Sequence, residues 1–219
     1  TNGLSKKTEN TLDRISQNII NKEQYLDFLR NRFFRQTLLC HNEIELRREL
    51  NPNYIKDLMV ASSAQPKEDS VDLSPNINQT FQGRAGSIVE SHFPATKAAM
   101  EVLAKYWPKA LSTDELFDKA WDMLSNSIKN NPVEAKEQLL ADIFHCFMVN
   151  AMELHTWQAD FIIEACELPK VSRLARYLHE NQKAPVNQRH EVVKMNAVAS
   201  RLVPFMDGSR KRAELLEVL

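Results

Sequence analysis

Hydrophobic residues recur every three or four positions along much of the chain, which is the spacing of one buried face of an α-helix. In residues 8–21 this repeat places Leu12, Ile15 and Ile19 on one face, with polar residues between them. A second helix is predicted over residues 22–30, because apolar side chains again fall on one side. The chain is therefore expected to begin with two short amphipathic helices.

Helical periodicity returns in the second half of the chain, where the helix ends also carry signals. Pro94 suits the first position of a helix, because its fixed φ is helical and its missing N–H needs no partner there; Pro108 ends the same helix. Ser112 and Glu115 have the spacing of a capping box. An Asn-Pro pair that ends at Pro132 opens another helix. Three consecutive helices are predicted here.

Short runs rich in serine, threonine, valine and phenylalanine lie between the two helical regions. They are separated by Pro66, Pro75, Gly83 and Gly86. This is the composition and punctuation of short strands joined by turns. The runs are LMVASSA, SVDL, INQTFQG and GSIVESHF. We therefore predict a small antiparallel β-region.

The order of elements predicts the fold class. After the three helices, residues 152–157 (MELHTW) and 160–163 (DFII) are predicted to be two strands, and further helices follow in residues 171–219. Three helices and a strand pair are the order of a winged-helix module. The predicted fold is α+β and mainly α, with an α+β domain over residues 1–92 and a winged-helix-like domain over residues 93–219.

The segment EQYLDFLRNRFFRQTLLC (residues 23–40) holds the densest local group of aromatic, aliphatic and arginine side chains. From Phe33 onward its period changes from helical to two. Both faces of the resulting strand would be apolar, which is typical of a strand covered on both sides. Residues 33–40 are therefore predicted to form a buried strand.

Arginines surround the point where this pattern changes. The candidate binding residues of the chain are Arg30, Arg32, Arg35 and Gln36. Guanidinium groups beside aromatic rings can bind a carboxylate, a phosphate or an acidic protein surface. The alternative is structural, in that the arginines pair with Glu23, Asp27 or Glu43 and orient the junction of helix and strand. The sequence leaves both interpretations open.

The composition argues against most catalytic and cofactor sites. The 219 residues include four glycines, at positions 3, 83, 86 and 208, so a phosphate-binding loop or a Rossmann-type pocket for S-adenosylmethionine is not expected. No G-x-S-x-G, H-E-x-x-H, P-loop or C-x-x-C motif occurs. The spacing of His145, Cys146, His155 and Cys166 matches no common zinc site. Neither a catalytic residue nor a metal ligand is predicted.

The net charge of −1 is unevenly distributed. Residues 112–168 have a net charge of −8, and residues 169–219 have a net charge of +5. The third predicted helix, residues 132–148, has a net charge of −2, whereas a helix that enters a DNA groove is neutral or basic. This argues against nucleic acid as a partner. The basic segment 169–219 nevertheless makes a winged-helix nucleic-acid-binding module the alternative function.

Cysteine content and hydropathy bear on the compartment. Three cysteines, an odd number, fit a reducing environment. No apolar run approaches the roughly 20 residues that span a bilayer, and no signal peptide is visible. We therefore expect a cytoplasmic protein with no membrane partner. Because the chain begins with Thr1 instead of Met, we also expect it to be a fragment of a longer protein.

The stretch EQYLDFLRNRFFRQTLLCH strongly resembles the opening signature of the predicted methyltransferase regulatory domain. Three later stretches are similar to the winged-helix-like C-terminal part of bacterial protein-lysine methyltransferase-like proteins. They are KAAMEVLAKYWPKALSTDEL, SRLARYLHENQKAPVNQRHEVV and FMDGSRKRAELLEVL. The resemblance extends from about residue 10 to the end of the chain.

The resemblance implies a non-catalytic regulatory or substrate-engaging module of a methyltransferase-like protein. The catalytic domain would lie elsewhere in the parent protein, and S-adenosylmethionine is expected in that domain and not in this fragment. The expected partners are the catalytic domain and a protein or peptide substrate. A free-standing enzyme has no motif to support it, although the parent is expected to be an S-adenosylmethionine-dependent methyltransferase.

Overall fold

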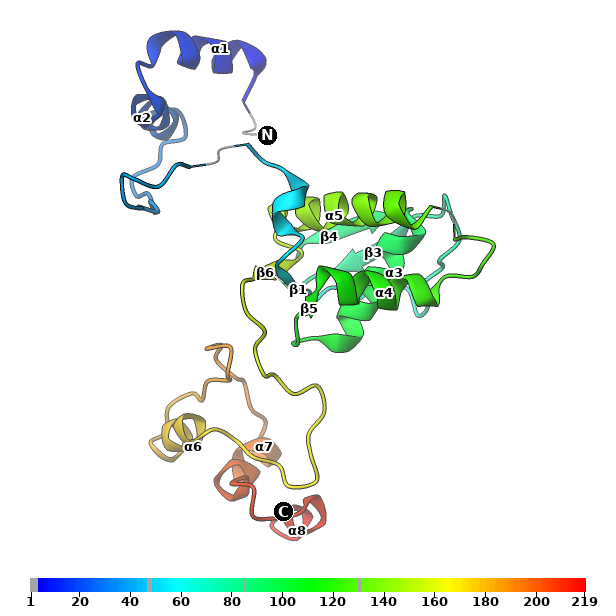
Figure 1. The fold of residues 1–219 in the computed structure, drawn as a ribbon. Helices are drawn as coiled ribbons and strands as arrows, with labels where there is room; N and C mark the ends of the chain where they lie inside the picture. The colour runs from blue at the N-terminus through cyan, green and yellow to red at the C-terminus, as the bar shows by residue number, and fades with distance from the viewer. Residues whose placement is uncertain (1–3, 47–48, 85, 130) are drawn as a thin grey trace. The chain divides into compact units, whose positions relative to one another are not determined.

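The computed structural model describes residues 4–46, 49–84, 86–129 and 131–219. The chain forms two compact units, Thr1–Glu49 and Leu50–Leu219 (Figure 1). Helices predominate over two small sheets, so the structure is α+β and mainly α, as the hydrophobic pattern predicted. The boundary predicted between residues 92 and 93 falls inside the second unit. The division into a regulatory and a winged-helix-like domain stays a prediction.

The first unit contains two capped helices. Helix α1 (Lys6–Ile15) follows Ser5, and helix α2 (Ile19–Leu29) follows Asn18; each cap residue accepts a backbone N–H of the first turn through its side-chain oxygen. The break between the helices comes earlier than predicted, because Asn18 is a strong N-cap that starts a new helix. The buried residues of the two helices are Leu12 and Leu26.

Residues 33–40 do not form the predicted buried strand. They have no regular secondary structure, and four of their large apolar side chains expose between 83% and 101% of their surface. These side chains are Phe33, Phe34, Leu38 and Leu39. A strand needs a neighbouring strand to bond its N–H and C=O groups, and the described residues of this unit offer none. The alternating pattern alone therefore did not make a strand.

The first sheet of the second unit joins segments that are far apart in the sequence. Strand β1 (Met59–Ala61) lies between β5 (Leu111–Ser112) and β6 (Glu153–His155) and is antiparallel to both. Strand β6 confirms the strand predicted in MELHTW. The strand predicted over residues 160–163 is wrong, because β1 already pairs with β6. The partner of β6 thus comes from before the three helices and not from after them.

The second sheet confirms the small antiparallel β-region. Its strands are β2 (Gln65–Pro66), β3 (Gln79–Gln82) and β4 (Ile88–Ser91), in that order and antiparallel. Phe81 and Val89 are paired across β3 and β4, and both are buried. The SVDL run joins β2 to β3 without forming a strand.

The three helices predicted after the β-region are present, and they share one hydrophobic core with the sheets. They are α3 (Pro94–Tyr106), α4 (Thr113–Met123) and α5 (Pro132–Met148), and α3 packs against both of the others (Figure 1). The side chain of Ser112 caps α4 and that of Asn131 caps α5. The prolines and cap residues in the sequence therefore marked the starts of these helices correctly.

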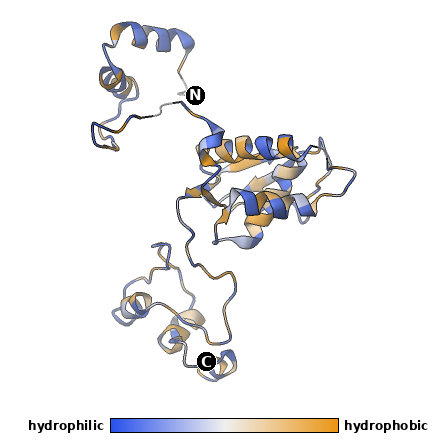
Figure 2. Cartoon of the chain, in the orientation of Figure 1, coloured by the Kyte–Doolittle hydropathy of each residue, from blue (hydrophilic) through white to orange (hydrophobic). Residues whose placement is uncertain are grey.

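One hydrophobic core unites the sheets and these helices. Its most deeply buried large side chains come from β3, α3, β5, α4 and α5, and they expose 1% of their surface or less. They are Phe81, Met100, Leu103, Leu111, Leu116, Leu139 and Ile143. Along the helices, hydrophobic residues are interspersed with polar ones (Figure 2). Burial of this apolar surface is the main stabilising contribution to the unit.

The C-terminal part of the second unit is made of short helices. They are α6 (Arg173–Glu180), α7 (Ala197–Leu202), the 3₁₀ helix η2 (Val203–Phe205) and α8 (Arg212–Leu216), and a short 3₁₀ helix, η1 (Pro52–Ile55), opens the unit. These helices confirm the helical pattern predicted within residues 171–219.

Arg189 fastens this C-terminal part to the rest of the unit. Its guanidinium donates two hydrogen bonds to Glu153, of 2.7 and 2.8 Å, and one of 3.3 Å to Glu191. It also lies 4.3 Å from the centre of the Trp107 ring and 5.7 Å from that of Phe161. Because Glu153 is on β6, these contacts join residues on either side of the long connection between β6 and α6.

Candidate functional site

Two of the four candidate binding residues form ion pairs within the first unit. Arg35 lies 2.5 Å from one carboxylate oxygen of Asp27 and 4.0 Å from an oxygen of Glu23. Arg32 lies 3.8 Å from the other carboxylate oxygen of Asp27. Arg32 and Arg35 therefore form ion pairs of the kind that the structural alternative described. The pairs are partly exposed, so each contributes little stability.

The other two candidates occupy different positions. Arg30 is the C-cap of α2, and its backbone N–H bonds the carbonyls of Leu26 and Phe28. Gln36 is exposed in the irregular segment that follows. The structure thus brings Arg32 and Arg35 together around one carboxylate and leaves Gln36 outside that group. A binding role for the four residues stays a prediction.

The strongest surface feature of the first unit is apolar. We call residues 28–39 the exposed segment; five of its six large apolar side chains expose between 81% and 101% of their surface. They are Phe28, Phe33, Phe34, Leu38 and Leu39. The sequence pattern identified these residues but predicted that they are buried. An apolar pattern indicates burial, but it does not identify the element that would cover the side chains. The same stretch carries the arginines described above.

Exposed apolar side chains and arginines together are typical of surfaces that bind other proteins. Aromatic residues and arginine are enriched where proteins meet, and large exposed apolar patches mark interaction sites. Asp27 holds Arg32 and Arg35 beside the apolar side chains, so their remaining N–H groups can meet acceptors on a partner. The exposed segment is therefore the candidate functional site of the first unit.

The histidine and cysteine residues noted in the sequence lie in different environments. His155 lies 3.1 Å from a carboxylate oxygen of Glu153, and Cys166 is exposed. Cys146 is buried, and this burial, with the Asp142 carboxylate, raises the pKa of its thiol to about 12. The described residues contain no group of three His, Cys, Asp or Glu side chains that could hold a metal ion.

No helix in the described ranges combines the length and the apolar composition that crossing a membrane requires. The helices instead have polar faces or are short.

Two segments of the chain match family models. Residues 1–41 match the predicted methyltransferase regulatory domain. Residues 167–219 match the C-terminal winged helix domain of PKMT. The first match includes the exposed segment, and the second includes Arg189 and helices α6 to α8.

Known proteins resemble nearly the whole chain. PKMT2 from Rickettsia typhi, solved in complex with AdoHcy, superposes with a TM-score of 0.80 and 22% identity over 98% of this chain and 43% of its own. A second structure of PKMT2 from Rickettsia typhi gives a TM-score of 0.79 with 21% identity, over 99% of this chain and 45% of its own. These similarities show a shared fold.

Two proteins of Rickettsia prowazekii (strain Madrid E) are similar in sequence. Uncharacterized protein RP789 is 26% identical over 208 residues, which are 92% of this chain and 37% of that protein. Uncharacterized protein RP027 is 24% identical over 200 residues, which are 89% of this chain and 76% of that protein. The chain therefore spans less than half the length of RP789 and of PKMT2. The chain thus contains one segment, residues 1–41, that matches the predicted methyltransferase regulatory domain, and one segment, residues 167–219, that matches the C-terminal winged helix domain of PKMT.

Proposed function

We propose that this chain is a non-catalytic regulatory or substrate-engaging module of an S-adenosylmethionine-dependent methyltransferase. The observation that carries the proposal is the pair of coverages in the structural match, 98% of this chain but 43% of PKMT2. A module that accounts for less than half of a methyltransferase, and that matches a regulatory and a winged helix family, leaves the chemistry to the remainder of that protein. The catalytic domain is then the first partner of this module.

The sheets of the second unit support a cofactor site outside this chain. Rossmann-type folds bind their cofactor at the ends of parallel strands, beside a glycine-rich turn. Both three-stranded sheets here are antiparallel. Gly83 and Gly86 belong to the turn between β3 and β4, and Gly208 lies shortly before α8. We infer that S-adenosylmethionine binds in the catalytic domain of the parent protein.

Calorimetry with S-adenosylmethionine and with its demethylated product tests the non-catalytic assignment directly. We expect no heat of binding for the 219-residue chain. The part of PKMT2 outside the matched region, measured under the same conditions, provides the positive control. Micromolar affinity of this chain for either ligand would overturn the assignment.

The exposed segment is the surface by which the module would dock on the catalytic domain. Its aromatic and aliphatic side chains supply apolar area to bury, and the arginines can reach acceptors at the rim. Docking would give residues 33–40 the covered environment that their apolar pattern indicates. A protein or peptide substrate could then be held between the module and the catalytic site.

A binding experiment with matched variants tests the docking. We expect the double substitution Phe33→Ser and Phe34→Ser to weaken association with the catalytic part of PKMT2 by about tenfold or more, as loss of central aromatic anchors does. Ile88→Ser is the control, because Ile88 exposes 62% of its surface in the second unit. Equal affinities of the two variants would refute docking through the exposed segment.

The nucleic-acid alternative rests on the basic winged helix segment. One of its cations is already engaged, because Arg212 donates to the carbonyl oxygens of Ala165 and Cys166. Salt-dependent binding of a DNA duplex that disappears when Arg210, Lys211 and Arg212 become alanine would favour this function. Binding of the duplex that does not depend on salt and is unchanged in the alanine variant would exclude this function.

A further inference from the structure

The backbone of residues 33–40 makes no hydrogen bond to any residue that the structure describes. The last backbone hydrogen bond before this stretch is that of the Arg32 N–H to the carbonyl of Asp27, at 2.9 Å. The stretch contains no proline, so every residue in it has an N–H to donate as well as a carbonyl to accept. A row of backbone donors and acceptors is therefore open to a partner.

In a strand, the side chains of this stretch would form two apolar faces. Successive side chains of a strand point to opposite sides, so Phe34 and Leu38 would share one face. Phe33 and Leu39 would share the other. Each of the four exposes at least 83% of its surface in this chain. A strand that is apolar on both faces requires one apolar layer above it and another below it, whereas a groove or a single helix covers one side only.

Arg35 lies between these apolar positions and can be covered with them, because its charge is already paired. Its guanidinium lies 2.5 Å from a carboxylate oxygen of Asp27, and the two side chains are 29% and 19% exposed. Burial of a charge without a partner is strongly unfavourable, and a counter-ion that is buried with it lowers that cost. Because Asp27 is on α2, this contact also holds the stretch to the end of that helix.

We propose that residues 33–40 add as an edge strand to the sheet of the catalytic domain, between the layers of helices that cover that sheet. The catalytic domain is the partner under the proposed function, on which this inference rests. A Rossmann-type domain has a mostly parallel sheet with helices on both faces. The edge of such a sheet offers backbone groups to pair with and an apolar layer on each side. Addition of a strand to a sheet edge is a recurring mode of recognition between proteins.

A second copy of this chain fits these observations less well. Two copies of residues 33–40 could pair their backbones, but a two-stranded ribbon leaves both of its faces exposed and is marginally stable in water. The large side chains on both faces would remain uncovered. The described residues of the first unit contain no strand that could widen the ribbon. A sheet that already has its two helical layers meets both requirements at once.

Amide hydrogen exchange tests the strand addition in the full-length parent protein, with the 219-residue chain alone for comparison. An edge strand directs every second N–H to its neighbour, so we expect alternate amides of residues 33–40 to exchange about a hundredfold more slowly in the parent protein. The amides between them should stay unprotected. Mass spectrometry with residue resolution reads this pattern. Protection in the chain alone that grows with its concentration would identify a second copy as the partner and overturn the proposal.

Gln36→Pro and Thr37→Pro form a matched pair, because each removes one backbone N–H and neither removes a large apolar side chain. Adjacent N–H groups of a strand point in opposite directions. We therefore expect one proline to abolish the protection of residues 33–40 in the parent protein and the other to preserve it. In the 219-residue chain alone, both variants should keep the midpoint of thermal unfolding, because these N–H groups make no hydrogen bond to the described residues there. Equal effects of the two prolines on protection would overturn strand addition.

Binding of S-adenosylmethionine by the parent protein separates this proposal from the proposed function. If the parent protein binds S-adenosylmethionine but alternate protection of residues 33–40 is absent, strand addition is wrong and the proposed function stands. If the parent protein does not bind S-adenosylmethionine, the proposed function is wrong and strand addition to a catalytic domain is wrong with it.

Discussion

Arg189→Ala removes the side chain that ties the winged helix segment to the sheet of the second unit. Arg189 is 15% exposed and makes hydrogen bonds to Glu153 and Glu191, and its guanidinium lies over the Trp107 ring. The substitution would leave the Glu153 carboxylate without its strongest partner. Because the contact joins β6 to the C-terminal part, its loss is expected to lower the stability of both.

The size of the effect follows from the exposure of each partner. Buried hydrogen bonds to charged groups contribute about 1.5–3 kcal/mol each, and partial exposure reduces this to about 1 kcal/mol. Glu153 and Glu191 are 40% and 43% exposed, so the reduced value applies to them. The contact with Trp107 adds about 1 kcal/mol. We expect Arg189→Ala to lower the free energy of unfolding by about 3 kcal/mol, and Arg189→Lys by about half of that, since lysine keeps the charge but loses the planar fork.

Urea unfolding monitored by tryptophan fluorescence measures these changes, with Arg201→Ala on the exposed surface of α7 as the control. The control should change the free energy of unfolding by less than about 0.5 kcal/mol. A double-mutant cycle with Glu153→Gln should give a coupling energy of about 1–2 kcal/mol. A coupling energy near zero, or an Arg189→Lys variant as stable as the unmodified chain, would refute the proposed role of the guanidinium.

Three further measurements test other features of the structure. Iodoacetamide should label Cys40 and Cys166, which are exposed, whereas Cys146 should react only after unfolding, since burial raises the pKa of its thiol to about 12; labelling is read by mass spectrometry. The hydrogen bond from Asn187, and then the hydrogen bond and charge of Arg189, lower the pKa of Glu191 below its ordinary value of 4.5. Its carboxylate therefore stabilises the fold above pH 4.5, and this contribution is lost as the pH falls through the folded pKa. Glu191→Gln should therefore lower the midpoint of thermal unfolding at pH 7 and have no effect below the folded pKa. Lys97→Met should lower the free energy of unfolding, measured with urea, by about 1–3 kcal/mol. The reason is that the buried Lys97 ammonium donates to two backbone carbonyls, at 2.6 and 2.9 Å. An unchanged free energy of unfolding would refute that role.

The elements that the sequence predicted well are those whose signals are local. Pro94, Ser112 and Asn131 act on the first turn of their own helices, so a short stretch of sequence contains all the information required. The strands Gln79–Gln82 and Ile88–Ser91 are similarly joined by a short turn at Gly83 and Gly86. Interactions within a few residues of each other determine these elements.

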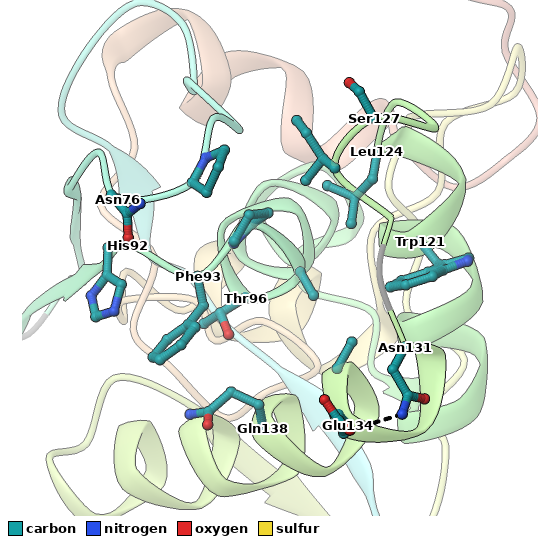
Figure 3. Close-up of a pocket in the computed structure, with 15 residues that line it drawn as sticks. Asn76, His92, Phe93, Thr96, Trp121, Leu124, Ser127, Asn131, Glu134 and Gln138 are labelled. Atoms are coloured by element: carbon teal, nitrogen blue, oxygen red, sulfur yellow. Dashed lines mark hydrogen bonds between the residues drawn. The ribbon is translucent and has the colours of Figure 1, made fainter.

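The pairing of β1 could not be predicted in the same way. Its register places Val60 opposite Leu111 on one side and Leu154 on the other, across wide separations in sequence. Nothing in a three-residue apolar run specifies such partners. A cavity of about 450 Å³ beside Trp121 could not be predicted for a related reason (Figure 3). Its lining comes from helices α3, α4 and α5 and from the loops around Pro75 and Ser127, whose relative placement follows from the shared core.

The exposed segment shows how an apolar pattern can be correct about chemistry and still wrong about burial. Covering one such side chain is worth about 1.5–3 kcal/mol, so the five most exposed apolar residues of the segment could together supply roughly 7–15 kcal/mol. Association of two separate proteins costs a comparable 4–15 kcal/mol or more. Two domains of one polypeptide avoid most of that cost, because the tether keeps their effective concentration on the order of millimolar. If the proposed function is correct, the segment would therefore bind a tethered catalytic domain firmly and a separate one weakly. The loss of docking caused by Phe33→Ser with Phe34→Ser should then be largest in the full-length protein.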